Sequence, residues 1–428
     1  MGFNALIGPH RNIGARLNLA AQRADTPWGQ VESVEFLSRL FPATSNELSH
    51  AEVTLAAVSA QTPWANTTNL NLQLRLVSLA PRPDVVDAAL SLRAASAATP
   101  WASVGPIQMK AHWIHAVTNP MPESGYIELA AETADTRWAR GAGVQFSATL
   151  ARATNIVAPD PTLAMWTNLL AYQLDWSTQV RVAKSFGLDA ENVRAEGHWC
   201  APELMVTNLQ ARLYRGTLEA EARLDIVTRQ LDFNAACNFD LKRLAPLFSG
   251  ESRDWLEKLT WSEPPWLRCS GAFALPGWTE SNPDWPGTLL PSLQLGGQIA
   301  ATNCAYAGFY ANWLRTHLTC TNRFWSLPDF TAGRPEGQLA FAHTVNEANG
   351  DFDFRIQSTL DLSPVRSFLA AGAQEAFDWC EFTSPPVIQG QLWGNWTNLN
   401  RIGFQGELAL TNFTFRELHV DSVVTQLH

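Results

Sequence analysis

The chain has 428 residues, of which 46% are hydrophobic, 16% are charged and 18 are tryptophans, and its formal net charge is −10. This acidic balance excludes a typical nucleic-acid-binding protein, which needs clustered cations to displace counterions from phosphates. The high apolar content excludes a disordered chain and predicts a folded protein with large apolar surfaces.

A four-residue phrase recurs through the first third of the chain at steps of 36, 37 and 37 residues. Its copies are Thr26-Pro27-Trp28-Gly29, Thr62-Pro63-Trp64-Ala65, Thr99-Pro100-Trp101-Ala102 and Thr136-Arg137-Trp138-Ala139. Repeats of this length are typical of stacked supersecondary units, each of which buries its apolar face against a neighbour. Residues 1–157 are therefore predicted to form four β-hairpin repeats of about 37 residues.

The repeated tryptophan has two interpretations. As a packing residue, it closes the end of its repeat and packs against the next one, while the preceding proline marks the strand break. As a ligand-binding residue, it belongs to a ladder of aromatic rings that binds carbohydrate. We predict the packing role.

Alternation of polar and apolar residues with a period of two runs through the whole chain. Residues 69–76 place four leucines on one face of a predicted strand and polar side chains on the other. Residues 218–226, 231–241 and 352–362 repeat the pattern. The sequence therefore predicts a mostly β protein whose strands have one apolar and one polar face.

Helical signals are few. Residues 158–185 are predicted to interrupt the repeats with a helix that Asp160 caps, and further helices are expected over 254–261 and from Ser363. The uncharged stretch 285–314 is rich in proline, glycine and asparagine, so we predict paired strands there and not a membrane-spanning helix.

No motif for catalysis or metal binding emerges. His112 and His115 are three residues apart in a predicted strand and so face opposite sides, and His198 beside Glu196 lacks a third ligand. Asn349 and the glycine after it predict a hairpin turn and not a calcium loop. The chain is predicted to have no catalytic residue, no metal and no cofactor, and not to be an enzyme.

The six cysteines are widely spaced and contain no CxxC pair, which excludes zinc ribbons and thioredoxin-type chemistry. Their predicted role is that of small buried apolar residues. The alternative is a disulfide in an oxidising compartment, with Cys304 and Cys320 as the preferred pair.

The second half contains a longer repeat, because residues 239–248 match residues 360–368. Residues 186–428 are therefore predicted to form two β modules of about 120 residues, the second of them truncated. The phrase Tyr214-Arg215-Gly216-Thr217-Leu218, followed by Phe239-Asp240-Leu241, resembles the C-terminal repeats of the AsmA/TamB-like proteins of diderm bacteria. The resemblance covers residues 190–428 well and the first 150 residues loosely.

This resemblance implies an elongated, twisted, repetitive antiparallel β-sheet that is curled into a groove (a β-taco, or repeating β-groove). It also implies a fragment of a periplasmic, bridge-like lipid carrier, anchored to the inner membrane by a segment absent from this chain. The expected partners are phospholipids, together with inner- and outer-membrane proteins at the missing ends. Acyl chains are expected to contact a set of apolar side chains: Leu70, Leu72, Leu74, Leu76, Leu218, Leu224, Ile226, Phe233, Phe239, Phe352, Phe354, Ile356 and Leu360.

Two other functions are consistent with one-sided strands. An assembly factor for outer-membrane β-barrel or autotransporter proteins would use exposed strand edges as templates. A structural or adhesin-like β-repeat protein would instead cover its apolar face with a second sheet and have a closed core.

Overall fold

The computed structural model describes residues 2–7, 13–27, 29–44, 47–79, 81–136, 139–154, 160–185, 187–247, 250–280, 283–306, 309–361, 374 and 379–427. The chain divides into two compact units: unit 1 (residues 1–212 and 223–227) and unit 2 (residues 213–222 and 228–428). The predicted fold class is confirmed, because the protein is mostly β, with antiparallel strands and a few short helices.

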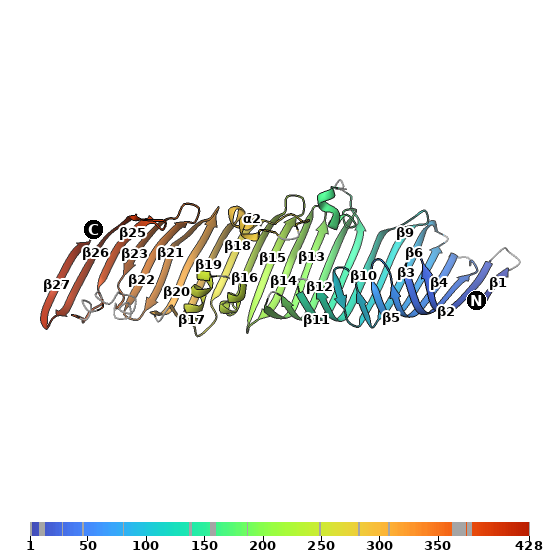
Figure 1. The fold of residues 1–428 in the computed structure, drawn as a ribbon, viewed down its shortest axis with the longest axis horizontal. Coiled ribbons are helices and arrows are strands. Elements are labelled where there is room, and N and C mark those ends of the chain that lie inside the picture. Colours follow the sequence, from blue (N-terminus) through green and yellow to red (C-terminus); the bar gives the residue numbers. More distant parts are fainter. Residues whose placement is uncertain are drawn as a thin grey trace. The chain divides into compact units, whose positions relative to one another are not determined.

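Unit 1 is a meander of long antiparallel strands (Figure 1). Its strands are β1 (Gly2–Ile7), β2 (Ile13–Thr26), β3 (Gly29–Phe41), β4 (Glu47–Gln61), β5 (Asn66–Leu79), β6 (Arg82–Ala94), β7 (Ser96–Ala98), β8 (Ala102–Val104), β9 (Ile107–Ala116), β10 (Asn119–Thr136), β11 (Ala139–Arg152), β12 (Tyr172–Ser185), β13 (Leu188–Cys200) and most of β14 (Glu203–Leu213). Each strand pairs with its neighbours in sequence, except that the short hairpin β7–β8 is inserted between β6 and β9. The boundary between the units lies in β14 and β15 (Gly216–Asp225).

The repeated Thr-Pro-Trp phrase forms a tight turn held by its threonine. The Oγ1 atom of Thr62 accepts a hydrogen bond from Ala65 N at 2.9 Å and donates one to Ala65 O at 2.9 Å. Thr99 makes the same two bonds with Ala102, each at 3.1 Å. Because the hydroxyl replaces a backbone partner, the threonine stabilises a turn of fixed geometry between two strands.

The sequence predicts that the tryptophan of each phrase packs against the next repeat. This prediction is wrong for the second and third copies, whose tryptophans the structure describes. Trp64 is 63% exposed and Trp101 is 70% exposed. The physical reason is position, since each residue stands at the tip of a turn, beyond the last strand residues against which it would pack. The tryptophans of the first and fourth copies lie outside the described residues.

A short 3-10 helix, η1 (Pro161–Trp166), stands between β11 and β12. Its N-terminus is the predicted one, because the carboxylate of Asp160 accepts a hydrogen bond from Thr162 N at 2.7 Å. The indole of Trp166 stacks on that of Trp199 at a centroid distance of 5.3 Å, and Trp199 donates its Nε1–H to Leu169 O at 3.0 Å. The segment therefore covers Trp199, which is only 2% exposed.

Unit 2 is a second antiparallel array. Its strands are β16 (Gln230–Cys237), β17 (Leu259–Trp261), β18 (Trp266–Ala274), β19 (Gln294–Tyr306), β20 (Phe309–Thr321), β21 (Phe324–Arg334), β22 (Gly337–Asn346), β23 (Asp351–Ser358), β24 (Cys380–Phe382), β25 (Val387–Asn395), β26 (Asn398–Phe415) and β27 (Leu418–Leu427). Its helices are η2 (Leu241–Leu247), α1 (Gly250–Lys258) and α2 (Trp285–Ser292).

The sequence match between residues 239–248 and 360–368 corresponds to a repeated topology in unit 2. In the first copy β16 pairs with β18, β17 with β19, and β18 with β19. In the second copy β23 pairs with β25, β24 with β26, and β25 with β26. In both copies, a three-residue strand (β17 or β24) pairs with the C-terminal end of a long strand (β19 or β26).

Two helix predictions need correction. The helix expected over 254–261 ends at Lys258, and residues 259–261 form β17, because they pair with β19. The stretch 285–314, for which the sequence predicts paired strands, begins with the helix α2. Asp284 caps the N-terminus of this helix by accepting a 3.0 Å hydrogen bond from Gly287 N. The helix expected from Ser363 lies outside the described residues.

The predicted Asn-Gly turn is confirmed. Gly350 has a φ of 79°, a conformation that favours glycine, and Asn349 Oδ1 accepts a hydrogen bond from Asp351 N at 3.0 Å. The buried amide of Asn395 donates to Asn349 O at 2.8 Å and to the Asp351 carboxylate at 2.7 Å. This hydrogen-bonded cluster fixes the turn between β22 and β23 to the end of β25.

Several tryptophans lie over a glycine on the neighbouring strand. Gly333 pairs directly with Trp313, and a Cβ at residue 333 would lie 2.4 Å from the indole ring. A methyl group at this position therefore has no room unless the indole moves.

We predict that Gly333→Ala destabilises unit 2 by about 1–3 kcal/mol, because overpacking displaces the Trp313 ring. Denaturant unfolding monitored by circular dichroism measures the change. The matched control is Gly296→Ala, where the added Cβ meets no atom within 4 Å. Equal unfolding midpoints for the two variants would contradict the prediction.

Candidate apolar groove

The strands of unit 1 are paired in a register that aligns apolar side chains across the sheet. Directly opposed residues of neighbouring strands lie on the same face. One cross-strand row consists, in order from β2 to β14, of Leu19, Phe36, Leu55, Leu72, Leu92, Met109, Leu129, Phe146, Thr178, Ala195 and Leu209. All of them are apolar apart from Thr178.

The next two rows along the strands repeat this character. The second row is Leu17, Ser38, Val53, Leu74, Leu90, Ala111, Ile127, Ala148, Trp176, Gly197 and Val206. The third row is Ala15, Leu40, Ala51, Leu76, Ala88, Trp113, Gly125, Leu150, Leu174, Trp199 and Leu204. We call the surface formed by these three rows the apolar face of unit 1.

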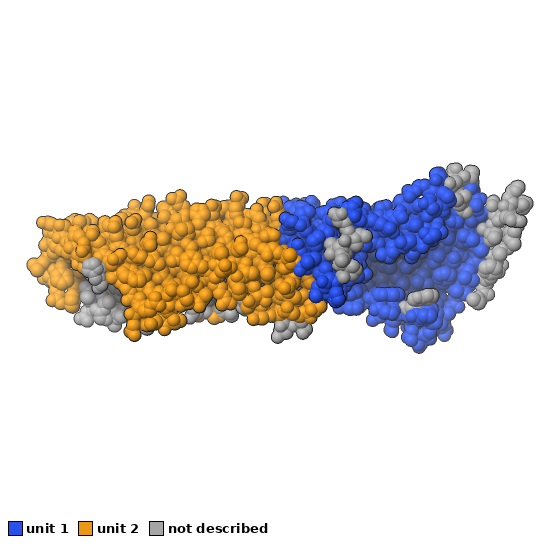
Figure 2. Space-filling view, turned by 90° about the horizontal axis from the view of Figure 1, so that it is seen from above, with its two compact units in different colours: residues 1–212, 223–227 blue, residues 213–222, 228–428 orange. Residues whose placement is uncertain are grey.

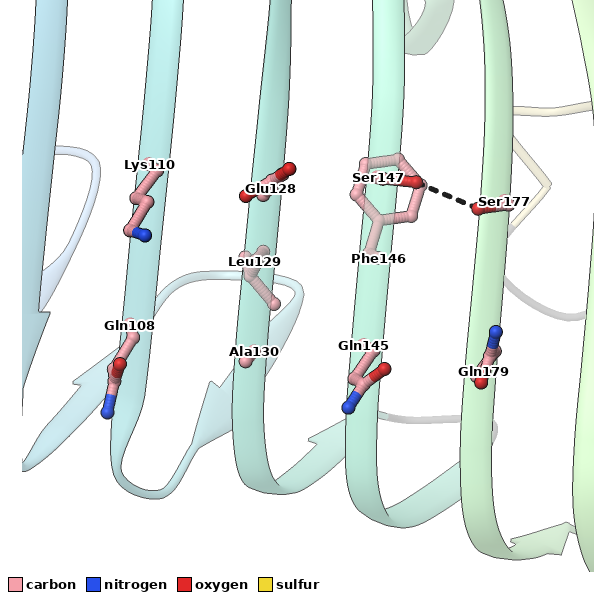
Figure 3. Close-up of a pocket in the computed structure, with 10 residues that line it drawn as sticks. All are labelled: Gln108, Lys110, Glu128, Leu129, Ala130, Gln145, Phe146, Ser147, Ser177 and Gln179. Carbon is pink, nitrogen blue, oxygen red and sulfur yellow. Dashed lines mark hydrogen bonds between the residues drawn. The ribbon is translucent and has the colours of Figure 1, made fainter.

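The opposite face of the same strands is polar. Between the first two apolar rows lies a row that includes Lys110, Glu128, Ser147 and Ser177. Figure 3 shows these four side chains on successive strands, with the Ser147 and Ser177 hydroxyls 2.8 Å apart. They border a depression of about 370 Å³ on the polar face. Polar and charged side chains on this face stay in contact with water.

The two faces differ in burial. On β5, Leu70 is buried and the next three leucines on that face are half-buried, whereas Gln73 and Arg75 between them are exposed. Side chains on the inside of a curved sheet crowd one another, and those on the outside spread into water. On β5 the apolar face is therefore the less exposed of the two faces. Figure 2 shows that the surface of unit 1 is hollowed between two raised margins.

No second sheet covers this face within the part of the chain that the structure describes. All described strands of unit 1 belong to one sheet, and the strands in close contact are hydrogen-bonded neighbours. The segment around η1 covers the face only near Trp199. Elsewhere the apolar side chains are partly screened from water by one another.

Unit 2 has an apolar face of the same kind. One of its rows, from β19 to β26, is Ala301, Leu314, Ala332, Leu339, Ser358, Ile388 and Leu408. An aromatic cluster lies beside this row, with Phe330 stacked on Phe341 at 4.0 Å and Phe341 at 5.1 Å from Phe354. Phenylalanine rings in contact with one another therefore form part of the apolar face of unit 2.

The structure places the predicted lipid-contacting residues in two groups. Ten of them lie on strands with alternating faces: Leu70, Leu72, Leu74 and Leu76 on β5, Leu218 and Leu224 on β15, Phe233 on β16, and Phe352, Phe354 and Ile356 on β23. The other three lie after strand ends and are buried by protein: Ile226 at 0%, Phe239 at 5% and Leu360 at 2% exposed. These three pack within the protein and are not available to a ligand. Of the first group, Leu70 and Phe352 are nearly as buried, at 8% and 6% exposed.

Sequence reasoning missed many members of the apolar rows. Phe36, Leu55, Leu92, Met109 and Phe146 belong to the first row but were not selected as lipid-contacting residues. Each stands in an alternating segment, so the signal was present. The register that joins these segments into rows was not available from one sequence.

All six cysteines are free thiols. Cys237, Cys304 and Cys320 are buried, as predicted, whereas Cys200, Cys269 and Cys380 are half-buried. Cys304 pairs with Ala311, so Cys320 stands nine residues further along β20, or roughly 30 Å at the usual strand rise. The proposed Cys304–Cys320 disulfide is therefore excluded by the register. Burial, with a smaller contribution from neighbouring Cys269, raises the pKa of Cys237 to about 11.

His112 and His115 face opposite sides of the sheet as predicted, and His112 and His198 each lie beside a carboxylate. His112 lies on the polar face, with Nε2 2.8 Å from the Asp87 carboxylate, whereas His115 stacks beside Trp113 on the apolar face. His198 Nδ1 lies 2.8 Å from Asp175. Among the described residues, no group of three or more His, Cys, Asp or Glu side chains has the geometry of a metal site.

Within the described part of the chain, no helix has both the length and the apolar character required to span a bilayer. Comparison with models of known protein families, with curated proteins and with solved structures finds no match.

Thiol reactivity provides a test of the packing around β16. In the folded protein at pH 8, Cys237 should react with iodoacetamide roughly a hundredfold more slowly than in denatured protein, because its raised pKa leaves little thiolate. Quantitative peptide mass spectrometry after timed quenching measures both rates. Equal rates in the folded and denatured states would show that Cys237 is not buried as described.

Proposed function

We propose that this chain is a segment of a lipid carrier. Its apolar faces hold the acyl chains of phospholipids and leave the headgroups in water. Lipids move along a face by diffusion, and the segment performs no covalent chemistry. Any energy input comes from outside the segment.

One observation carries the proposal: the apolar rows of unit 1 extend from β2 to β14 with no described second sheet against them. A soluble protein rarely leaves so large an apolar surface without a partner. The row that includes Leu55, Leu72 and Leu92 presents an apolar side chain on each of its strands except β12, where it has Thr178. Such a surface matches a ligand that is long, flexible and uniformly apolar.

Energetics favour an acyl chain as the ligand. Removing a methylene group from water is worth about 0.8 kcal/mol, so a single lipid tail gains several kcal/mol on this face. The gain is similar at most positions because nearly all side chains of the three rows are apolar. A uniform energy along the path lets a lipid move without being trapped.

The cellular setting of the proposal comes from the AsmA/TamB-like resemblance. In that setting the segment belongs to a periplasmic bridge between the inner and outer membranes and carries phospholipids between them. The absence of a covering sheet in the described residues also makes a closed-core adhesin the less suitable alternative. Assembly of outer-membrane β-barrel proteins would depend on strand edges and not on the apolar faces.

A matched set of charge substitutions tests the function. We expect Leu74→Asp in unit 1 and Ile356→Asp in unit 2 each to reduce co-purifying phospholipid about fivefold, because a carboxylate among acyl chains lacks solvation. The controls are Gln73→Asp and Gln357→Asp, which place the same charge one residue away on the exposed polar face. Lipid per chain is measured by extraction and mass spectrometry.

Circular dichroism and the thermal unfolding midpoint establish that each variant is folded. The proposal fails if wild-type protein carries no phospholipid, or if polar-face and apolar-face substitutions lower bound lipid equally.

A further inference from the structure

Two exposed tryptophans stand at equivalent positions on one margin of unit 1. Trp64 and Trp101 occupy the third position of their Thr-Pro-Trp-Ala turns and are 63% and 70% exposed. Packing within the sheet does not explain them, and neither lies on the apolar face. A large aromatic side chain held in water is costly unless a partner covers it.

The turns hold the backbone beneath these side chains rigidly. Trp64 N and Ala65 N both donate to Thr62 Oγ1, at 3.3 and 2.9 Å. Trp101 N makes the corresponding 3.3 Å bond to Thr99 Oγ1. The proline before each tryptophan fixes its own φ angle. Each indole is therefore mounted on a turn that loses little conformational freedom on binding.

Strand register places the turns along the same edge of the sheet. Asn66, which follows the first turn, pairs with Ala98, which precedes the second. Ala102, at the end of the second turn, pairs with Thr136, which begins the fourth copy of the phrase. Two strand spacings separate successive turns, so their centres are about 10 Å apart. The margin therefore presents its aromatic side chains in a line.

The two turns that carry Trp64 and Trp101 are uncharged, whereas the fourth copy of the phrase has Arg137 in its sequence. Residues 61–68 and 96–103 contain no charged side chain. The charges that flank them are paired internally, Arg23 with Asp25 at 3.2 Å and Arg140 with Asp135 at 3.0 Å. The margin offers no cluster of cations for an anionic partner.

Polar groups for recognising a sugar are also absent from the turns. Apart from tryptophan, each turn contains only proline, alanine and a threonine. The hydroxyl of Thr62 is used within its own turn, since it accepts from Ala65 N and donates to Ala65 O. A carbohydrate platform needs hydrogen-bonding side chains beside its aromatic ring, whereas the interface of a bilayer needs only an amphipathic indole.

We propose that this margin of unit 1 docks on the surface of a zwitterionic lipid bilayer, with Trp64 and Trp101 inserted at the level of the headgroups. Two exposed indoles on uncharged turns along one edge of the sheet match the headgroup level of such a bilayer. Docking is separate from the carriage of lipid on the apolar face, and each can fail without the other.

Flotation with unilamellar vesicles of phosphatidylcholine and phosphatidylethanolamine tests the inference. The double variant Trp64→Ala, Trp101→Ala is expected to bind the vesicles about tenfold more weakly than wild type, because it loses both interfacial indoles. Raising the salt concentration should change wild-type binding less than about twofold, because the turns that carry Trp64 and Trp101 are uncharged. Trp285→Ala is the matched control, since Trp285 is 50% exposed but lies on α2 of unit 2.

Three results would overturn the inference: no binding of wild type to vesicles, equal binding by the double variant, or a loss of polysaccharide binding in the double variant instead of vesicle binding. Unfolding midpoints of the variants should match that of wild type, because both side chains are exposed. Co-purifying lipid, measured on the same double variant, separates docking from carriage: unchanged lipid with lost flotation supports docking by this margin.

Discussion

The register of the antiparallel strands is the constraint on which this structure depends. Each apolar side chain stands opposite another, as Leu72 does between Leu55 and Leu92, so the two-residue alternation of single strands becomes a continuous face. A slip of one residue would place Gln73 in the apolar row and turn Leu70, Leu72, Leu74 and Leu76 toward water. The tight threonine-held turns set the length of each hairpin and so help to fix this register.

An open apolar face then follows from the absence of a second layer in the described residues. Such a face is stable in water only while its side chains screen one another. The half-buried leucines of β5 are in this intermediate state. The same state makes the face receptive to acyl chains, because a bound tail completes burial without any rearrangement of the sheet.

Much of this fold could be predicted from alternation alone, since a period of two identifies both the strands and their faces. The errors occurred where tertiary position outweighs local pattern. Trp64 is exposed because it stands at a turn tip, and residues 259–261 extend a sheet because β19 offers them a pairing edge. Ile226 and Leu360 continue the alternation of their strands, but they lie beyond the strand ends and are buried. Register, and with it the apolar rows, arises from pairing that one sequence does not record.

The most direct test of the central claim is photocrosslinking at neighbouring positions of one strand. A benzophenone amino acid is placed at Leu74, on the apolar face, or at Gln73, on the polar face, and the purified protein is irradiated and analysed by mass spectrometry. The account predicts phospholipid adducts at residue 74 and none at residue 73. Equal capture at both positions, or capture at neither, would contradict it.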